Sequence, residues 1–589
     1  MILERLKSRL RHAVSGGERA SVWDGIEDLP LLTAIAAAIG IVVGLLVAGF
    51  RAFIDLGLSY LPRLNAQEHF QLFGQLHHFV LPVVGALIAV LLLAALGKSS
   101  RVVGVVHVME RFSSSDVRMP LRNTVYQFLG GSLALIFGIS GGREGPAIHL
   151  GASASSWIAH RLRLPHNAVR VLVACGIASG IAASFDVPIA SVVFTVEVIM
   201  MEYTIATFLP LMLAAFTSTF LVQQIYPYEP IFPVSTYTLS NYWELPYIVA
   251  LGVAIGIVAS FFKYATELVA EVKTGEIWHR MMTAGILTGA VALVFPQVLG
   301  MGWETASLLL SETTEPIANP IWIILALVIA KIVVTSACVG SGLPVGIIGP
   351  SIVIGVMLGV LGGDVGRLLV PTGDASDPAF YALLGTVAML SAVLNAPLAA
   401  LLTVVELSAN HHVVLPGLLA IVAATLTTYV LYGRKSIFVQ RLHALGISYP
   451  PSPSVQFLRR NSIAASMNAR IAITESKDEA LSHIVKEQPK EVSTEKAEWV
   501  VEWQSHDSAR VYEVSTAPKS LHGICVPIIS SRSSLEEALT LMNQKDVDLV
   551  CASERRTPNG IIGVLTRSAI ENLQTQSPRP TQSGNRSSS

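Results

Sequence analysis

The sequence predicts an all-α polytopic membrane protein with two internally repeated halves that contain broken helices, followed by a small cytoplasmic α+β domain. Of the 589 residues, 52% are hydrophobic and only 14% are charged, whereas soluble domains usually carry about 25% charged residues. The charged residues gather at the two ends of the chain and are sparse over residues 31–431. Within this apolar region, glycine–proline loops recur at nearly constant spacing, which indicates a repeat.

Residues 1–30 form a short amphipathic segment that we expect on the cytoplasmic side of the membrane. Several basic residues precede the first apolar run, and basic residues flanking a first span favour a cytoplasmic N-terminus. No small-residue cleavage site follows a short apolar core, so we expect no removable signal peptide. The expected protein is integral and multi-pass, in the cell (inner) membrane, with both termini in the cytoplasm.

Charge and cysteine content argue against other classes of protein. A net charge of −1 gives no case for nucleic-acid binding. The four cysteines form no CxxC pair and divide between the apolar region and the C-terminal part, so nothing indicates a disulfide framework. We expect no metal site.

The first repeat half, about 31–226, begins with two ordinary spans at 31–61 and 77–96, each long enough to cross a bilayer. Beyond residue 102 the apolar segments become short and are broken by glycine, proline and isolated polar residues. These segments are 102–112, 125–137, 147–158, 168–184 and 189–201, and the span 203–225 closes the half. Interrupted spans are typical of transporters whose half-helices point at an ion site near the midplane.

The second repeat half, about 245–445, follows the same scheme. Its expected helices are 246–265, 286–299, 321–338, 412–431 and the shorter 433–445. We expect the halves to be inverted: an odd number of spans in each half would require inversion, and a central ion site between the halves fits that arrangement.

Sequence landmarks place the two halves in register. Pro188 and Pro397 open similar apolar helices 209 residues apart (397 − 188), and Glu197 and Glu406 within those helices have the same separation (406 − 197). The two glycine–proline loops, which end at residues 146 and 350, are 204 residues apart (350 − 146). The symmetry of the glutamates predicts that both are structural, with hydrogen bonds from backbone N–H groups.

The loop at 141–146 places Arg143 and Glu144 among glycines, directly before Pro146. A carboxylate at membrane depth is costly and therefore indicates function. Pro146 is suited to begin a helix, and the free N–H groups and positive dipole end of a helix start make an anion site. We expect Glu144 to occupy this site as a gate, until protonation or a mobile anion displaces it. The alternative is a structural ion pair in a glycine-rich helix joint.

Three further features allow more than one interpretation. Lys331 lies inside an apolar run and either draws anions to the pathway or is a paired structural lysine. His149 has a role either in proton transfer or in helix packing. Residues 138–141 have the GxSG form of intramembrane serine proteases. A protease predicts neither the internal repeat nor the second glycine–proline loop, so we expect no enzyme.

The chain resembles the CLC family of chloride channels and chloride/proton antiporters. The resemblance covers residues 31–445 and rests on Gly142-Arg143-Glu144-Gly145-Pro146, on Gly346-Ile347-Ile348-Gly349-Pro350, and on the two helices that begin at Pro188 and Pro397. It implies a homodimer with one anion pathway in each subunit. It also implies that Glu144 is the gate, that Gly142, Arg143, Gly145 and Gly346 line the anion loops, and that the N–H groups of Ile347 and Ile348 bind the central anion.

The sequence departs from this family pattern at three positions. Val103 stands where the family has an anion-binding serine, and Phe438 stands where it has a tyrosine hydroxyl. Val198 stands at the inner proton-transfer position, and valine carries no proton. These losses favour chloride conduction that is channel-like or loosely proton-coupled, with a chloride/proton antiporter as the alternative.

Residues 446–573 resemble a pair of CBS modules, and the second module is the clearer. It is carried by Leu535–Leu539 and Gly563–Ala569. The position of the family's ribose-binding aspartate is Ala569, so an adenine nucleotide here is an open question beside a structural or dimerising role. We expect no other cofactor. Residues 574–589 are rich in Ser, Gln and Pro and are expected to be disordered.

Overall fold

The chain folds into two compact units in its structure, a computed structural model. One unit comprises Leu29–Arg161 with Arg170–Tyr449, and the other includes the chain from Pro450 onward. The predictions for residues 1–28 and 577–589 lie outside the described residues. The described residues are 29–60, 70, 74–97, 102–114, 117–162, 164, 166–226, 232, 238–272, 276–311, 321–369, 376–433, 435–447, 449, 458, 461–474, 498–505, 507–513, 523–531, 533–554 and 560–576.

The larger unit is helical and has the character of a membrane domain. Among the described residues, eight helical stretches are long and apolar enough to cross a membrane. They contain α2 (Leu29–Tyr60), α3 (Gln75–Leu96), α7 (His166–Phe185), α9 (Ile205–Ile225), α10 (Leu245–Glu271), α13 (Ile321–Ser341), α14 (Ile348–Leu369) and α17 (Val414–Tyr432).

Shorter helices stand between these spans. The first half contains α4 (Gly104–Phe112), α5 (Leu121–Ile136), α6 (Glu144–Arg161) and α8 (Pro188–Phe194). The second half contains α11 (Ile277–Ala292), α12 (Trp303–Ser311), α15 (Pro378–Leu394), α16 (Pro397–Ser408) and α18 (Ile437–Ala444).

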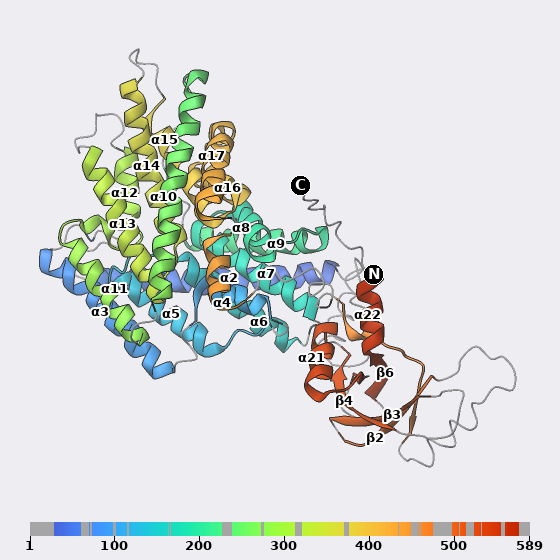
Figure 1. Ribbon diagram of the computed structural model, residues 1–589. Helices are drawn as coiled ribbons and strands as arrows, with labels where there is room; N and C mark the ends of the chain where they lie inside the picture. The colour runs from blue at the N-terminus through green and yellow to red at the C-terminus, as the bar shows by residue number, and fades with distance from the viewer. Residues whose placement is uncertain are drawn as a thin grey trace, which may run out of the picture. The chain divides into compact units, whose positions relative to one another are not determined.

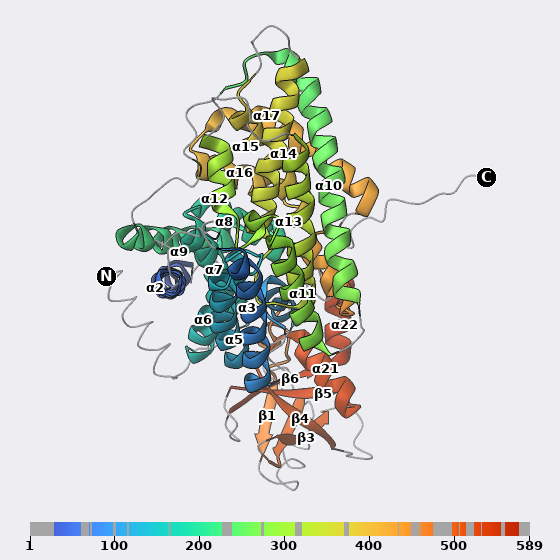
Figure 2. The same cartoon turned by 90° about the vertical axis from the view of Figure 1, so that its left-hand side faces the viewer.

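The halves pack in equivalent ways; Figure 1 and Figure 2 show the first half as the blue-to-teal helices and the second as the green-to-orange helices. Helix α2 packs along α9 in the first half, and α10 packs along α17 in the second. Helix α3 meets its counterpart α11, and α8 meets its counterpart α16. Counterparts that touch each other indicate a two-fold axis between the halves.

Two equivalent glycines lie beside a two-fold axis between the halves. The Gly142 N–H donates to the Gly346 carbonyl at 2.8 Å, and the Gly346 N–H donates to the Gly142 carbonyl at 2.7 Å. This antiparallel pair joins residues 204 positions apart (346 − 142). When equivalent residues exchange identical hydrogen bonds, a local two-fold axis passes between them.

The two equivalent glutamates repeat this exchange. The Glu406 carboxylate accepts from the N–H groups of Ile189 at 2.9 Å and Ala190 at 2.7 Å, at the start of α8. The Glu197 carboxylate accepts from Leu398 at 3.3 Å and Ala399 at 2.9 Å, at the start of α16. Each half thus caps the broken helix of the other, which confirms the structural role predicted for both glutamates.

Some predicted helix boundaries were wrong. Helix α11 runs over Ile277–Ala292 rather than 286–299, and a 3-10 turn at Pro296–Val298 follows it. Proline lacks the N–H that would continue a helix. Helix α6 begins at Glu144, not at Pro146. Beyond α8 the chain continues as a π-helical turn, Thr195–Met200, which the sequence pattern did not predict.

Small residues bring α14 and α15 into close contact. A Cβ atom on Gly355 would lie 2.6 Å from the Thr386 Cα, and one on Gly359 would lie 2.5 Å from the Ala382 Cα. Glycine at such positions lets helix backbones approach, which is typical of helix packing in membranes.

The C-terminal unit contains a six-stranded sheet in the order β1-β2-β3-β4-β5-β6. Strand β1 is parallel to β2 and β2 is antiparallel to β3, and the strands β4, β5 and β6 repeat this pairing. The elements are β1 (Ile471–Thr474), β2 (Trp499–Trp503), β3 (Ser508–Glu513), β4 (Ile524–Ser530), α21 (Leu535–Lys545), β5 (Leu549–Ser553), β6 (Ile561–Thr566) and α22 (Arg567–Gln576). This small α+β domain is compatible with a repeated module.

Candidate functional site

Glu144 lies at the junction of the two halves. Its side chain is fully buried, and Oε1 accepts a hydrogen bond from the N–H of Gly349 in the first turn of α14. The other carboxylate oxygen, Oε2, has no hydrogen-bond partner among the described residues. The first residue of α6 therefore places its anion at the N-terminus of the equivalent helix in the other half.

Glycines make the space that this carboxylate fills. A Cβ atom on Gly142 or Gly346 would collide with Glu144 Oε2, and one on Gly349 would lie 2.5 Å from Oε1. A Cβ atom on Gly145 would lie 3.2 Å from the Gly346 Cα, so the loops also touch there. A carboxylate or a small anion fits between these loops. A larger residue at position 142, 346 or 349 would fill the space.

Backbone dipoles contribute positive potential at this point. Helices α6 and α14 both begin here, and a helix N-terminus carries about half a positive charge together with unpaired N–H groups. Ile347 and Ile348 are buried at the start of α14. The Arg143 guanidinium lies 5.5 Å from the centroid of the Phe185 ring, where the ring face attracts a cation.

The structure packs together the two elements that carry Val103 and Phe438. Val103 is the N-cap residue of α4, and Phe438 is buried in the first turn of α18. Helix α4 packs against α18. Neither side chain supplies a hydroxyl, so any anion held between these helix starts depends on backbone N–H groups.

Val198 lies in the π-helical turn and is 2% exposed. The neighbouring Ile199 carbonyl accepts a hydrogen bond from the Tyr449 hydroxyl. π-Helical turns often occur at functional sites. This one presents an apolar side chain where the family pattern has a proton-transfer residue.

Two residues that the sequence singled out, Lys331 and Ser140, have hydrogen-bond partners that account for them structurally. The Lys331 Nζ donates to the carbonyls of Val298 and Gly300, each at 2.9 Å, which favours a structural lysine. The Ser140 hydroxyl is fully buried and hydrogen-bonds to the Thr335 hydroxyl at 2.9 Å. The partner of Ser140 is therefore a hydroxyl and not a histidine base, which argues against the protease interpretation.

His149 has a partner that sequence reasoning missed. Its Nε2 lies 2.9 Å from Nδ1 of His107 on α4, and both rings are buried. The two residues are 42 positions apart, so no local spacing reveals the pair.

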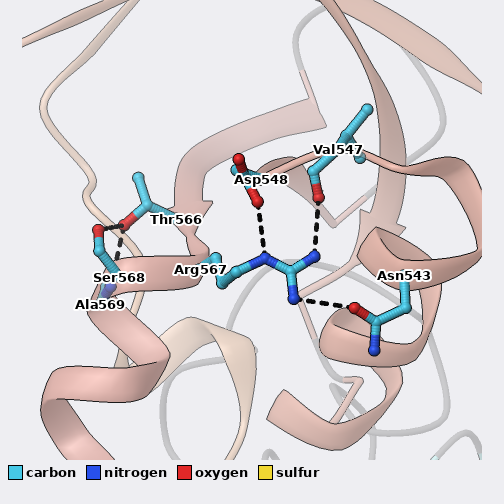
Figure 3. Close-up of polar contacts among 7 residues, drawn as sticks. All are labelled: Asn543, Val547, Asp548, Thr566, Arg567, Ser568 and Ala569. Carbon is cyan, nitrogen blue, oxygen red and sulfur yellow. Dashed lines mark hydrogen bonds and ion pairs between the residues drawn. The ribbon is translucent and has the colours of Figure 1, made fainter.

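The second part of the C-terminal unit presents a polar cluster at the turn between β6 and α22 (Figure 3). The Thr566 hydroxyl accepts from the Ala569 N–H at 3.1 Å, and Arg567 donates to Asp548 at 2.7 Å and to Asn543 at 2.8 Å. Ala569 contributes no carboxylate to hold a ribose. Arg567 ties β6 and α22 to α21 and β5, so the cluster has a structural role.

Two halves related by a two-fold axis, two helix N-termini that meet at this axis, and a buried carboxylate between them define an ion-transport protein of the membrane. Residues 85–429 match the family model described as voltage gated chloride channel. The chain therefore belongs to this family, the CLC family, as the sequence motifs predicted.

Two curated relatives illustrate the range of this family. The putative chloride channel protein ClcB-like of Ralstonia nicotianae is 30% identical over 343 residues, which cover 57% of this chain and 78% of the relative. The H(+)/Cl(-) exchange transporter ClcA of Vibrio parahaemolyticus is 28% identical over 327 residues, which cover 54% of this chain and 68% of the relative.

Solved structures share the fold at lower sequence identity. A slow cyanobacterial Cl-/H+ antiporter superimposes with a TM-score of 0.61 at 21% identity, over 70% of this chain and 98% of that chain. A eukaryotic CLC transporter superimposes with a TM-score of 0.58 at 18% identity, over 92% of this chain and 98% of that chain.

Proposed function

We propose that this protein conducts chloride or a similar small anion through a pathway that Glu144 gates, in a channel-like or loosely proton-coupled manner. The observation that carries the proposal is the position of the Glu144 carboxylate, which accepts the N–H of Gly349 at the start of α14. Backbone N–H groups at a helix start also replace the hydration shell of a mobile anion. The carboxylate and the mobile anion therefore compete for the same donors.

Proton binding to Glu144 opens this gate in the proposed mechanism. A protonated carboxyl has no charge for the helix dipoles to hold, so the side chain leaves and an anion takes its place. Anion flux then rises as the external pH falls. A high anion concentration acts in the same direction by competition.

Three apolar side chains support weak coupling between anions and protons. Val198 has no proton-carrying group, and Val103 and Phe438 provide no hydroxyl donors for the central anion. An anion bound by backbone groups alone is held less tightly than one that also has hydroxyl donors, and weaker binding favours conduction because the anion leaves the site more readily.

An antiporter is the second candidate, because the relative from Vibrio is named an H(+)/Cl(-) exchange transporter. The two candidates differ in proton movement. Chloride and proton fluxes recorded together in proteoliposomes distinguish them. A fixed stoichiometric proton uptake driven by a chloride gradient would establish the antiporter, whereas proton movement far below stoichiometric supports loose coupling.

The gate is tested by Glu144→Gln, which removes the charge and keeps the shape. We expect the variant's chloride flux to be insensitive to external pH and close to the flux of the unaltered protein at low pH. Glu276→Gln, at an exposed position on the N-terminal side of α11, is the matched control and keeps the normal pH response. If Glu144→Gln also keeps that response, the gate assignment is wrong.

We also propose the assembly and location that the family implies. Two copies form a homodimer with separate pathways, in the cell (inner) membrane, with both termini in the cytoplasm. The mass of the detergent-solubilised particle tests the dimer, since a monomer in mild detergent with full anion flux contradicts it.

A further inference from the structure

Helices α4 and α6 share a buried pair of histidines that the gate mechanism does not use. His107 on α4 is 2% exposed and His149 on α6 is fully buried. The His107 Nδ1 lies 2.9 Å from the His149 Nε2, and the rings stack with centroids 5.2 Å apart at 22°. One N–H group lies between the two rings and is donated by one of them.

Arg111 gives this hydrogen bond a direction. Its Nε lies 3.4 Å from the His107 Nε2, and an arginine only donates. A neutral His107 therefore carries its proton on Nδ1 and donates it to the His149 Nε2. His149 in turn carries its proton on Nδ1, which is buried and has no hydrogen-bond partner among the described residues. An unpaired buried donor is costly and indicates a function.

One cationic side chain, Arg111, acts on His107. Arg170 lies over the Phe112 ring, 4.8 Å from its centroid, at the far end of α4. Glu110, half-buried, is the acidic residue of α4. Several ionisable groups on the other elements packed against α4 or α6 have partners elsewhere: Arg51 with Asp55 on α2, Arg367 of α14 with Asp377, Arg441 of α18 with the Val339 carbonyl, and His443 of α18 with Lys435. Asp364 of α14 has one buried carboxylate oxygen, Oδ2, without a hydrogen-bond partner among the described residues.

We propose that His107 and His149 form an internal proton relay of the anion pathway. A proton binds to the His107 Nε2 as Arg111 withdraws. The His107 Nδ1–H bond then breaks as an Nε2–H bond forms on His149, and a water molecule accepts the proton from the His149 Nδ1 and passes it to the Glu144 carboxylate. One proton enters, one leaves, and both rings end neutral. Ring rotation restores the starting tautomers.

The relay lies on the same helix as the Glu144 gate. In this respect the inference rests on the proposed function. Glu144 precedes His149 by five residues on the same helix, which is about 7.5 Å along its axis. The Glu144 Oε2 and the His149 Nδ1 are both buried without partners among the described residues. The relay thus ends on the helix whose first residue is the gate, and Arg111, half-buried, lies at its other end. It supplies a route for protons where Val198 has none.

His149→Gln tests the relay because an amide keeps a donor and an acceptor but does not pass a proton between them. Chloride and proton fluxes are recorded together in proteoliposomes that contain the full chain. We expect proton movement to fall on the order of tenfold or more, as for loss of a proton-transfer group, with chloride flux within about twofold of the unaltered protein. His107→Gln should do the same. His78→Gln is the control, since His78 is buried on α3 and its hydrogen-bond partner among the described residues is the Phe70 carbonyl, eight residues away.

The outcomes separate the relay from the gate. Unchanged proton movement in both His149→Gln and His107→Gln overturns the relay, and so does chloride flux without any proton movement in the unaltered protein. Both results leave the Glu144 gate in place. A protein that conducts no anion overturns the proposed function itself. Normal chloride flux in the variants shows that they have folded.

Discussion

Glu406→Gln perturbs a contact that joins the two halves. The Glu406 carboxylate accepts from Ile189 and Ala190 at 2.9 and 2.7 Å. A glutamine keeps one acceptor oxygen and turns its NH2 group toward a backbone N–H, so one hydrogen bond weakens and the other is lost. The start of α8 then has an unsatisfied donor.

The expected loss follows from the number and length of these bonds. A hydrogen bond to a charged group contributes about 1.5–3 kcal/mol, and solvent screening lowers this value at a half-buried carboxylate. We expect Glu406→Gln to lower the free energy of unfolding by about 2 kcal/mol. Glu197 has the longer bonds, at 3.3 and 2.9 Å. Glu197→Gln should therefore cost about 1 kcal/mol.

Thermal unfolding in detergent, at one scan rate, measures this difference. In a large protein 1 kcal/mol shifts the melting temperature by about 2 °C, so we expect shifts of about 4 °C for Glu406→Gln and about 2 °C for Glu197→Gln. The exposed Glu276→Gln should not shift it. The reasoning fails if Glu197→Gln melts below Glu406→Gln, or if both melt with the control.

Two further predictions concern packing and thiol chemistry. Gly359→Ala would place a Cβ atom 2.5 Å from the Ala382 Cα and should destabilise the protein by about 1–3 kcal/mol, whereas Gly49→Ala, with no atom within 4 Å of its new Cβ, should melt normally. Equal melting of the two variants would contradict the α14–α15 contact. Burial raises the pKa of the Cys551 thiol to about 12, so at pH 8 it stays protonated and unreactive. Mass spectrometry after maleimide treatment should find Cys525, which is exposed, as the labelled cysteine of the C-terminal unit, and Cys525→Ser should leave that unit unlabelled. Labelling of Cys551 in the folded protein would show that this part of the sheet opens.

Sequence reasoning succeeded where a local pattern carries the structure. The equal spacing of Glu197 and Glu406 predicted that both are structural, because equivalent positions in a repeat have equivalent neighbours. Glycines and a proline around Glu144 predicted a helix start with a buried carboxylate, since only a helix N-terminus makes such a site favourable. The loss of the family's proton-transfer residue was also visible in the sequence, because position 198 is a valine.

The rest depended on tertiary contacts that leave no local signal. Helix α15 is buried along its whole length, so it has no polar face to mark a period, and sequence reasoning did not predict it. The π-helical turn at Thr195–Met200 is set by its surroundings, not by residue propensity. A role for His107 could not be predicted from its own surroundings in the sequence, because it depends on contact with His149 of another helix.

Comparison of equivalent positions separates the scaffold from the function. Positions that hold the halves together are the same in both: Gly142 and Gly346, and Glu197 and Glu406. Positions that carry protons differ, because Glu144 corresponds to Ile348 and His149 to Val353 at the same spacing of 204 residues (348 − 144 and 353 − 149). A second carboxylate at the start of α14 would place two like charges in one buried site, where one of them could not ionise. A symmetric scaffold therefore carries an asymmetric gate, contributed by one half alone.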